Sequence, residues 1–345
     1  MEAYDVIIVG AGPAGLKCAE VLAKNNKRVI VLEKNSVFGD KICAGGLTLK
    51  DFGLGIPESI IQRKFKKVII HTPLQDTEIK LDKPFIATLD RKDLGKWMAD
   101  NAKKQGAEVK INSTVTKILD EKIIVNGKEE LYYKYLVGAD GANSIVRKHL
   151  GLENNNSLEA FQYVAQKKFK DLEVFINPGK FGPMYLWIFP YKNSVSIGTG
   201  ADLSKNIKRP ALDLSVSKIR SNFEDFCKKK IDLKKAKFQA FTINYDYQGH
   251  EFKNKFLVGD AGGFASGLTG EGIYFAIKSG EDVANKIISK RYKCPHIKNI
   301  LDIKKKEEML LRSFEVNKAL TEVEWEVFNR LFKSRWVEEK LVWLI

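Results

Sequence analysis

Apolar and polar positions at the start of the chain follow the pattern of a strand, a helix and a second strand. DVIIVG is a short apolar run, LKCAEVLAKNN has apolar residues at helical spacing, and RVIVLEK is again strand-like. The same reading predicts strands within 68–89, a helix and strand over 89–111, a strand and helix over 133–151, short strands over 158–200, a helix over 211–230, a strand over 237–247, a strand and long helix over 254–287, and helix from 301 onward. This alternation predicts an α/β fold with a second, more antiparallel sheet.

Composition and charge narrow the classes of protein that fit this pattern. The chain has 345 residues, 44% of them hydrophobic, which is enough to bury a core, and a net charge of +15. A basic surface attracts phospholipid headgroups, phosphate-bearing substrates or acidic proteins, although a solvated lysine-rich surface without a specific role fits equally well. No helix-turn-helix, zinc-finger or RNA-binding pattern is present, so a nucleic-acid partner is not expected.

The cysteines and the hydropathy of the chain indicate its compartment. Four cysteines are widely spaced without CxxC pairs, which argues against a disulfide framework and against a metal site. No signal peptide fits the start of the chain, and no apolar run approaches the roughly 20 residues that span a bilayer. We therefore expect a cytoplasmic protein that is at most peripheral on the inner face of the cell membrane.

A glycine-rich turn joins the first predicted strand to the first helix. Its sequence GAGPAG places Gly10, Gly12 and Gly15 at the spacing GxGxxG, and Glu33 ends the following strand. In this pattern the glycines allow a tight turn, close approach of a pyrophosphate and close helix packing, while the acidic residue accepts hydrogen bonds from a ribose hydroxyl. Strand, turn, helix, strand and acid together predict a dinucleotide site.

Two further strand-to-turn junctions favour FAD over NAD as the dinucleotide. They lie at Asp140 and at Asp260, and a loop containing Gly270 and Gly272 opens the helix that follows the second of them. NAD needs only the first glycine turn, whereas FAD also needs contacts to its ribityl chain and flavin. A carboxylate such as that of Asp260 suits the ribityl chain, and a helix N-terminus stabilises negative charge on a reduced flavin. The alternative is that these glycines only serve tight turns.

The combination of these motifs resembles a known superfamily. GAGPAG with Glu33, LDR with Arg91, GADGANSIVR and FLVGDAGGFASGLTGEGI are similar to the flavoproteins related to p-hydroxybenzoate hydroxylase. Within that superfamily, KICAGGLT at 41–48 and YLWIFPYKNSVSIGTG at 185–200 resemble the geranylgeranyl reductase family, whose pattern is YxWxFP, seven or eight residues, then GxG. The resemblance extends from the first strand to about residue 290.

The resemblance implies a set of cofactor contacts in addition to those that the residues suggest. The implied FAD contacts are Ala14, Glu33, Cys43, Ala44, Gly46, Arg91, Val115 through its main chain, Asp260, Gly272 and Ile273. Arg91 suits a pyrophosphate as a charge-assisted fork, although a surface arginine is the alternative. Cys43 is a candidate proton donor, and a small buried apolar residue is the other reading of it.

The aromatic motif predicts the substrate site. Read as a strand, it places Tyr185, Trp187 and Phe189 on one face, followed by Pro190, and it leaves Gly198 and Gly200 without side chains on the returning strand. We interpret this as an aromatic wall beside an open trench for a prenyl chain, ending at the flavin. An aromatic stripe packed in the core of its own sheet is the alternative.

The complete prediction is a Rossmann-like FAD-binding domain with an inserted, mostly antiparallel substrate domain that holds a prenyl lipid over the flavin. The predicted boundaries are 1–67, 90–157 and 248–292 for the FAD domain, 68–89 and 158–247 for the substrate domain, and 293–345 for a helical C-terminal segment. The apolar positions of that segment suit either a membrane interface or packing against the body: Leu320, Val323, Val327, Leu331, Trp336, Leu341, Trp343 and Leu344.

The expected reaction is saturation of carbon–carbon double bonds in a geranylgeranyl chain, with isoprenoid ether phospholipids as the expected substrates. We expect the electrons to come from NADPH, ferredoxin or another reduced carrier. We also expect that the protein can make peripheral contact with an anionic membrane. The alternatives are an FAD monooxygenase or halogenase on the same scaffold, and a prenyl-lipid binding protein with a non-catalytic flavin.

Overall fold

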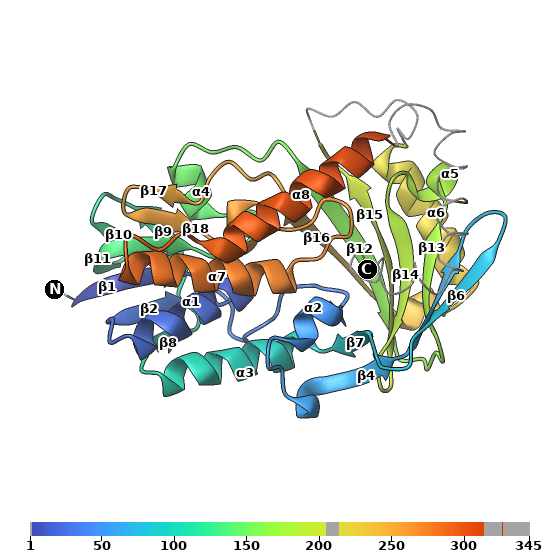
Figure 1. The fold of residues 1–345 in the computed structure, drawn as a ribbon, viewed down its shortest axis with the longest axis horizontal. Helices are drawn as coiled ribbons and strands as arrows, with labels where there is room; N and C mark the ends of the chain where they lie inside the picture. The colour runs from blue at the N-terminus through green and yellow to red at the C-terminus, as the bar shows by residue number, and fades with distance from the viewer. Residues whose placement is uncertain (1, 205–213, 314–325, 327–345) are drawn as a thin grey trace. The chain divides into compact units, whose positions relative to one another are not determined.

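The computed structural model in Figure 1 describes residues 2–204, 214–313 and 326. Contacts divide the chain into two compact units, which we treat separately. Unit 1 comprises Met1–Lys41, Arg91–Ser157 and Ile243–Lys305, and unit 2 comprises Ile42–Asp90, Leu158–Thr242 and Lys306–Ile345. Residues 42–67, assigned above to the FAD domain, fall in unit 2 because their strands β3 (Gly46–Leu47) and β4 (Ile61–Phe65) flank β7 (Ile86–Leu89) in one small sheet. The helix that follows residue 293 begins in unit 1.

Unit 1 is built on an eight-stranded sheet with the strand order β17-β18-β11-β1-β2-β8, to which β10 and β9 are added beside β11. Its strands are β1 (Glu2–Val9), β2 (Val29–Leu32), β8 (Glu108–Lys110), β9 (Val115–Ile118), β10 (Lys122–Val125), β11 (Glu129–Gly138), β17 (Glu251–Phe252) and β18 (Lys255–Leu257). The pairs β18/β11, β11/β1, β1/β2 and β2/β8 are parallel. A parallel core of this kind is expected of a Rossmann-like domain.

The two faces of this sheet are covered by different elements. On one face, helix α1 (Pro13–Lys24) packs against both α3 (Arg91–Lys104) and α7 (Ile273–Ile288). The opposite face packs on β9, β10 and α4 (Ile145–His149) through an apolar core that includes Ile7, Val9 and Leu136. Both faces of β1 and β2 are therefore buried, which explains why their sequences are continuous apolar runs.

Unit 2 contains a seven-stranded sheet and a three-stranded sheet. The larger one has the order β16 (Lys237–Asn244), β12 (Ser157–Ala165), β15 (Val195–Asp202), β14 (Tyr185–Pro190), β13 (Leu172–Ile176), β5 (Lys67–His71) and β6 (Asp76–Lys80). The smaller one has the order β3 (Gly46–Leu47), β7 (Ile86–Leu89) and β4 (Ile61–Phe65). Of the larger sheet's described pairs, β13/β5 is parallel and the others are antiparallel. This agrees with the prediction of a mostly antiparallel second sheet.

The two faces of the larger sheet carry separate apolar cores. On one face, Phe161, Leu186 and Ile188 pack with Phe223 of helix α6 (Val216–Lys228). On the other face, Val174 and Phe189 pack with residues of the small sheet. Because side chains alternate along a strand, Leu186 and Ile188 lie on the opposite face from Tyr185, Trp187 and Phe189.

Short helical elements and one long helix complete the described chain. They are α2 (Leu49–Phe52), η1 (Glu58–Ile60), α5 (Pro178–Phe181), η2 (Leu233–Lys235), η3 (Gly259–Gly262) and α8 (Pro295–Ser313). None of the helices in the described ranges has the length and apolar character needed to cross a bilayer. The amphipathic positions predicted at Leu320, Val323, Val327, Leu331, Trp336, Leu341, Trp343 and Leu344 lie outside the described residues.

Candidate functional site

The glycine turn after β1 is packed so closely that two of its glycines have no room for a side chain. A Cβ on Gly10 would lie 2.4 Å from the carbonyl oxygen of Ala139, and the φ of Gly10 is +102°. A Cβ on Gly15 would lie 2.1 Å from the carbonyl oxygen of Gly10. Gly12 differs, because its Cβ would meet only the Ala139 oxygen, at 3.9 Å. The turn is tight around Gly10 and Gly15 and open beside Gly12, where a phosphate can approach the main chain.

Ala14 lies at the second position of α1, against two other glycines. A Cβ on Gly280 of α7 would lie 2.2 Å from the carbonyl oxygen of Ala14, and one on Gly259 would lie 3.1 Å from the Ala14 Cβ. The start of α1 is therefore held in close contact with α7 and with the turn that follows β18. A larger residue than alanine at position 14 would separate these elements.

Glu33 follows β2, and its carboxylate is held by the main chain on both sides. Its Oε2 accepts a hydrogen bond from the Ala11 N–H at 2.9 Å, and its Oε1 accepts one from the Asn35 N–H at 3.0 Å. The half-buried carboxylate is thus fixed beside the glycine turn. In this position it has lone pairs left for a ribose hydroxyl.

The three predicted strand-to-turn junctions come together at one edge of the unit 1 sheet. They follow β1, β11 and β18, which are adjacent and parallel, so their carboxyl ends share an edge. At the middle junction, Asp140 accepts a hydrogen bond from the Ile145 N–H through Oδ2 at 2.6 Å, whereas its buried Oδ1 has no partner among the described residues. Burial raises the pKa of the Asp140 carboxyl above its ordinary value.

Asp260 lies at the third junction and is 9% exposed. Its carbonyl oxygen accepts a hydrogen bond from Asn244 Nδ2 at 2.8 Å, and its carboxylate lies 2.6 Å from Lys41 Nζ. A Cβ added to Gly272 would meet only Asp260 Oδ1, at 3.6 Å, so the start of α7 lies beside this carboxylate. Asp260 and the N-terminus of α7 are therefore neighbours, as the prediction of one shared ligand requires.

The loop that leads into α7 has the conformation that its glycines suggest. Gly270 has a φ of +69°, Gly272 is the N-cap residue, and Ile273 is the buried first residue of the helix. No side chain caps α7. A helix N-terminus without a side-chain cap is suited to a negatively charged ligand group.

Lys41 was not identified from the sequence as a site residue. It precedes ICAGG, the stretch that carries Cys43, and it forms an ion pair with Asp260 across 219 positions of sequence. A lysine next to a family motif is a weak signal by itself. Only the fold reveals that its ammonium group reaches the carboxylate.

Arg91 is the first residue of α3 and is 7% exposed. Its Nη1 is buried and has no hydrogen-bond partner among the described residues. A buried guanidinium with an unsatisfied N–H is costly unless a ligand completes it, and an anionic group such as a pyrophosphate does so. The open side of Gly12, the oriented Glu33 carboxylate and this N–H group all fit the phosphates and ribose of FAD.

Val115 lies in β9 with its side chain in the apolar core of unit 1. The residue as a whole, main chain included, is 7% exposed. The main-chain contact that the resemblance implies stays a prediction.

In unit 2, Cys43, Ala44 and Gly46 lie on one stretch that leads into β3. The Cys43 Sγ accepts a hydrogen bond from the Gly45 N–H at 3.3 Å, and the Ala44 carbonyl accepts one from the Tyr191 hydroxyl at 2.5 Å. A Cβ on Gly46 would lie 2.7 Å from the ring of Phe189. This stretch, residues 43–46, which we call the cysteine loop, is therefore anchored to the aromatic motif through Tyr191 and Phe189.

The three aromatic residues of the motif lie in a row on one face of β14. Ring centroids are 6.1 Å apart from Tyr185 to Trp187 and again from Trp187 to Phe189. Tyr185 and Phe189 are half-buried, while Trp187 is 6% exposed. Pro190 ends the strand, and its carbonyl oxygen accepts a hydrogen bond from Thr88 Oγ1 at 2.9 Å.

The prediction of an open trench over Gly198 and Gly200 is wrong in the structure. A Cβ on Gly198 would lie 2.2 Å from Cζ2 of Trp187, so the indole itself fills the space over this glycine. Over Gly200 lies the side chain of Met184, whose Cε would be 3.4 Å from an added Cβ, an ordinary van der Waals distance. Trp187 is opposite Gly198 in the strand pairing, and the missing side chain of Gly198 leaves room for the indole.

A hydrogen-bonded chain connects Trp187 to the cysteine loop. Trp187 Nε1 donates to Ser196 Oγ at 2.9 Å, and Ser196 Oγ donates to Gln162 Oε1 at 2.8 Å. Gln162 Nε2 lies 3.4 Å from the carbonyl oxygen of Cys43, to which it donates. Trp187 is thus part of the support of the cysteine loop as well as of the aromatic row.

Comparisons with known proteins support FAD as the cofactor of this chain. The family model of the FAD binding domain matches residues 3–292. An uncharacterized protein of Methanosarcina barkeri is 32% identical over 311 residues, covering 85% of this chain and 76% of that protein. A digeranylgeranylglycerophospholipid reductase of Methanococcus vannielii is 27% identical over 320 residues, covering 84% of this chain and 79% of that protein.

Solved structures agree with the fold. A geranylgeranyl bacteriochlorophyll reductase-like protein from Thermoplasma acidophilum superposes with a TM-score of 0.76 at 21% identity, covering 93% of this chain and 90% of that one. A flavin-dependent brominase and a p-nitrophenol monooxygenase also have this fold. At such low identity the structural likeness establishes the fold alone.

Proposed function

The chain belongs to the FAD-binding family of flavoproteins that includes the geranylgeranyl reductases, and from this premise we propose that it saturates carbon–carbon double bonds of prenyl chains. The proposed substrates are the geranylgeranyl chains of isoprenoid ether phospholipids. The observation that carries this proposal is the similarity to a digeranylgeranylglycerophospholipid reductase, which extends over 84% of the chain.

Cofactor binding in this proposal uses the groups described in unit 1. Bound FAD, once reduced, supplies the hydride that an isolated alkene needs. The main chain beside Gly12 and the N–H groups of Arg91 hold the phosphates, and Glu33 holds the ribose. Asp260, fixed through Asn244, accepts hydrogen bonds from the ribityl hydroxyls.

Substrate handling uses the groups of unit 2. A prenyl chain has no polar atoms, so its binding comes from burial against apolar surface, which the half-buried rings of Tyr185 and Phe189 offer. Exclusion of water by these rings protects the hydride from loss to solvent. Saturation of one double bond consumes one hydride and one proton. The proposed donor of that proton is Cys43.

Trp187 has a positioning role in this scheme. It does not line an open trench, but it supports the loop of Cys43 through Ser196 and Gln162. Loss of its side chain is therefore expected to move the proposed proton donor while leaving the groups of unit 1 in place.

The direct test is incubation of the dithionite-reduced holoprotein, without oxygen, with a digeranylgeranylglyceryl phospholipid and with geranylgeranyl diphosphate. Mass spectrometry of the products should show gains of two hydrogen atoms for each reduced bond. Trp187→Ala should reduce this turnover at least about tenfold with flavin content unchanged. No gain of hydrogen with either lipid would refute the reductase proposal.

A second candidate function is supported by the fold, which halogenases and monooxygenases share. It predicts rapid NADPH oxidation in air that a compact aromatic substrate stimulates. The same preparation distinguishes a prenyl-lipid binding protein, since a non-catalytic flavin would transfer no hydrogen to the lipid despite tight binding of it.

A further inference from the structure

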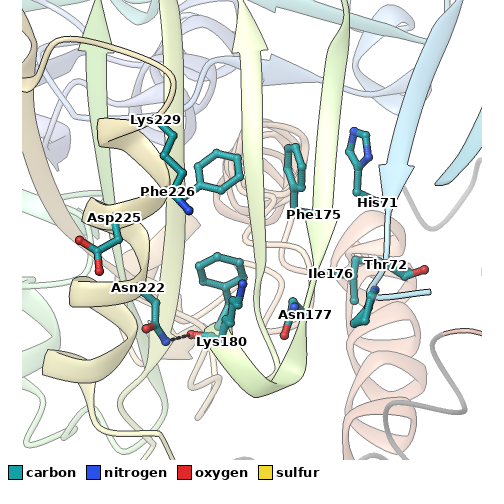
Figure 2. A pocket seen from close by; sticks show the side chains of 12 residues that line it. His71, Thr72, Phe175, Ile176, Asn177, Lys180, Asn222, Asp225, Phe226 and Lys229 are labelled. Atoms are coloured by element: carbon teal, nitrogen blue, oxygen red, sulfur yellow. Dashed lines mark hydrogen bonds between the residues drawn. The ribbon is translucent and has the colours of Figure 1, made fainter. Parts of the chain in front are cut away.

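Unit 2 contains a cavity of about 350 Å³ beside α5, α6 and the carboxyl ends of β5 and β13. Figure 2 shows the side chains that line it: aromatic rings at its centre, and amide and ammonium groups around them. Its volume falls at the lower end of the range for small-molecule sites. Neither the motifs of the sequence nor the proposed function uses this cavity.

The cavity lies on the opposite face of the large sheet from the aromatic motif. Phe175, which lines the cavity, is paired with Leu186 across the strands, while its neighbour Val174 is paired with Trp187. Adjacent residues of a strand point to opposite faces. A ligand in this cavity is therefore separated from the Trp187 face by the sheet itself.

One wall of the cavity is a continuous run of rings. His71 stacks on Phe175 with 4.2 Å between centroids and an angle of 14°, and Phe175 meets Phe226 edge to face at 4.8 Å. Phe181 adds a ring that is 3% exposed. These surfaces suit an apolar or aromatic group of a ligand.

His71 contributes a ring surface and not a free base. Its Nδ1 lies 2.8 Å from Asp76 Oδ1, and its Nε2 lies 3.2 Å from Glu173 Oε2. Glu173, and then Asp76, raise the pKa of His71 against the opposing effect of burial. Because both ring nitrogens face carboxylates, the cavity is arranged for binding and not for acid–base chemistry.

Two lysine ammonium groups lie at the cavity without an ion pair among the described residues. Within the described ranges, neither Lys180 nor Lys229 forms an ion pair, and Figure 2 shows both side chains beside the ring cluster. Asp225 is the acidic residue of the lining, but its carboxylate is paired with Lys228 at 3.0 Å and points away from the rings in Figure 2. The amide of Asn222 donates to the carbonyl of Lys180 at 3.0 Å and so ties α6 to α5.

We propose that this cavity is a second ligand site, which binds a small amphipathic anion. The apolar or aromatic part of the ligand packs on Phe175 and Phe226, and its carboxylate or phosphate lies between Lys180 and Lys229. A free metabolite anion and the headgroup of an anionic lipid share this chemistry. The proposal does not depend on the reaction that the FAD site performs.

The test is calorimetric titration of the holoprotein with phenyl phosphate, which combines one ring with one phosphate. Saturable binding is expected, and Lys180→Met together with Lys229→Met should weaken it about tenfold or more, because hydrogen bonds to charged groups are lost. Lys234→Met with Lys235→Met is the matched control, since these exposed lysines lie outside the cavity and remove the same charge. Flavin content and thermal unfolding verify that all variants fold.

Two results would overturn the proposal: absence of saturable binding to the wild-type protein, or equal weakening by the two pairs of substitutions, which would indicate general attraction to the basic surface. Sedimentation with phosphatidylglycerol vesicles separates the two sources of ligand. Vesicle binding that phenyl phosphate displaces, and that the Lys180 and Lys229 substitutions abolish, assigns the site to a lipid headgroup. Phenyl phosphate binding without such vesicle binding assigns it to a free anion.

Discussion

Glycines in the two units of this protein look alike in the sequence but are required for different reasons. In unit 1, the space that a side chain would need at Gly10 and Gly15 is occupied by main-chain atoms. In unit 2, the space at Gly46 and Gly198 is occupied mainly by the rings of Phe189 and Trp187. Main chain that directly continues a strand of the sheet cannot easily move aside, whereas a ring can be replaced. The two sets should therefore respond differently to mutation.

The largest effect is expected at Gly10. In Gly10→Ala, a Cβ would lie 2.4 Å from the Ala139 carbonyl oxygen at a φ of +102°. Left-handed backbone and overpacking together cost about 2–5 kcal/mol. Urea unfolding followed by circular dichroism should show this loss, and flavin absorbance per chain should fall close to zero because the turn beside the cofactor phosphates is displaced.

The matched control is Gly127→Ala in the same unit. Gly127 also has a positive φ, +75°, but a Cβ there would meet no atom within 4 Å. Only the backbone preference is lost, about 1–2 kcal/mol, and flavin content should be retained. Equal losses of stability and flavin in both variants would mean that backbone conformation, and not the main-chain contact, decides the role of Gly10.

An intermediate effect is expected at Gly198, where the neighbouring ring can be removed. Gly198→Ala should cost about 1–3 kcal/mol through overpacking against Trp187. In a Trp187→Ala background the same substitution should cost less by about 1 kcal/mol or more, because the indole is gone. The relief is partial, since the new Cβ would remain 2.7 Å from the carbonyl oxygen of Phe161.

Urea unfolding of the two single variants and the double variant provides the coupling free energy. Additive losses would show that Gly198 is not kept for the sake of the indole. In that case a ligand approaching the sheet at Gly198 would again be the better explanation of the motif.

The contrast between the units also explains what the sequence could and could not predict. The turn at Gly10, the position of Glu33 and the parallel strands that bring Asp140 and Asp260 to one edge follow from local patterns with fixed geometry. The residues of each pattern lie within about 30 positions of one another, or are brought together by the order of adjacent strands, so these features can be predicted from the sequence. The α/β architecture and the mostly antiparallel second sheet were correct for the same reason.

Contacts between side chains distant in sequence could not be predicted. The spacing of the aromatic motif places Trp187 and Gly198 on one face, but it does not say whether a ligand or the indole occupies the space over the glycine. Likewise, nothing near Lys41 indicates that it reaches Asp260. The boundary at residue 42 was missed because β3 and β4 pair with β7, which follows β4 in the chain only after β5 and β6.

The smallest effect is expected at Lys41, where an ion pair between side chains, and not packing of the main chain, supports the site in unit 1. Its ammonium group lies 2.6 Å from the carboxylate of Asp260, which is 9% exposed. In Lys41→Met this carboxylate keeps its charge without a partner, next to the place proposed for a ligand that carries two phosphates. Repulsion should then weaken FAD binding about tenfold, measured by fluorescence titration of the apoprotein.

Lys92→Met is the matched control for this prediction, because Lys92 lies in the same unit and forms an exposed pair with Asp40 at 3.1 Å. It removes the same charge and should leave FAD affinity nearly unchanged. Asp260→Asn added to Lys41→Met should recover part of the affinity, since the unpaired charge is removed. Tighter FAD binding by Lys41→Met would instead show that the Lys41–Asp260 ion pair competes with the cofactor. In that case this ion pair would limit access to a site that is formed mainly by main-chain groups.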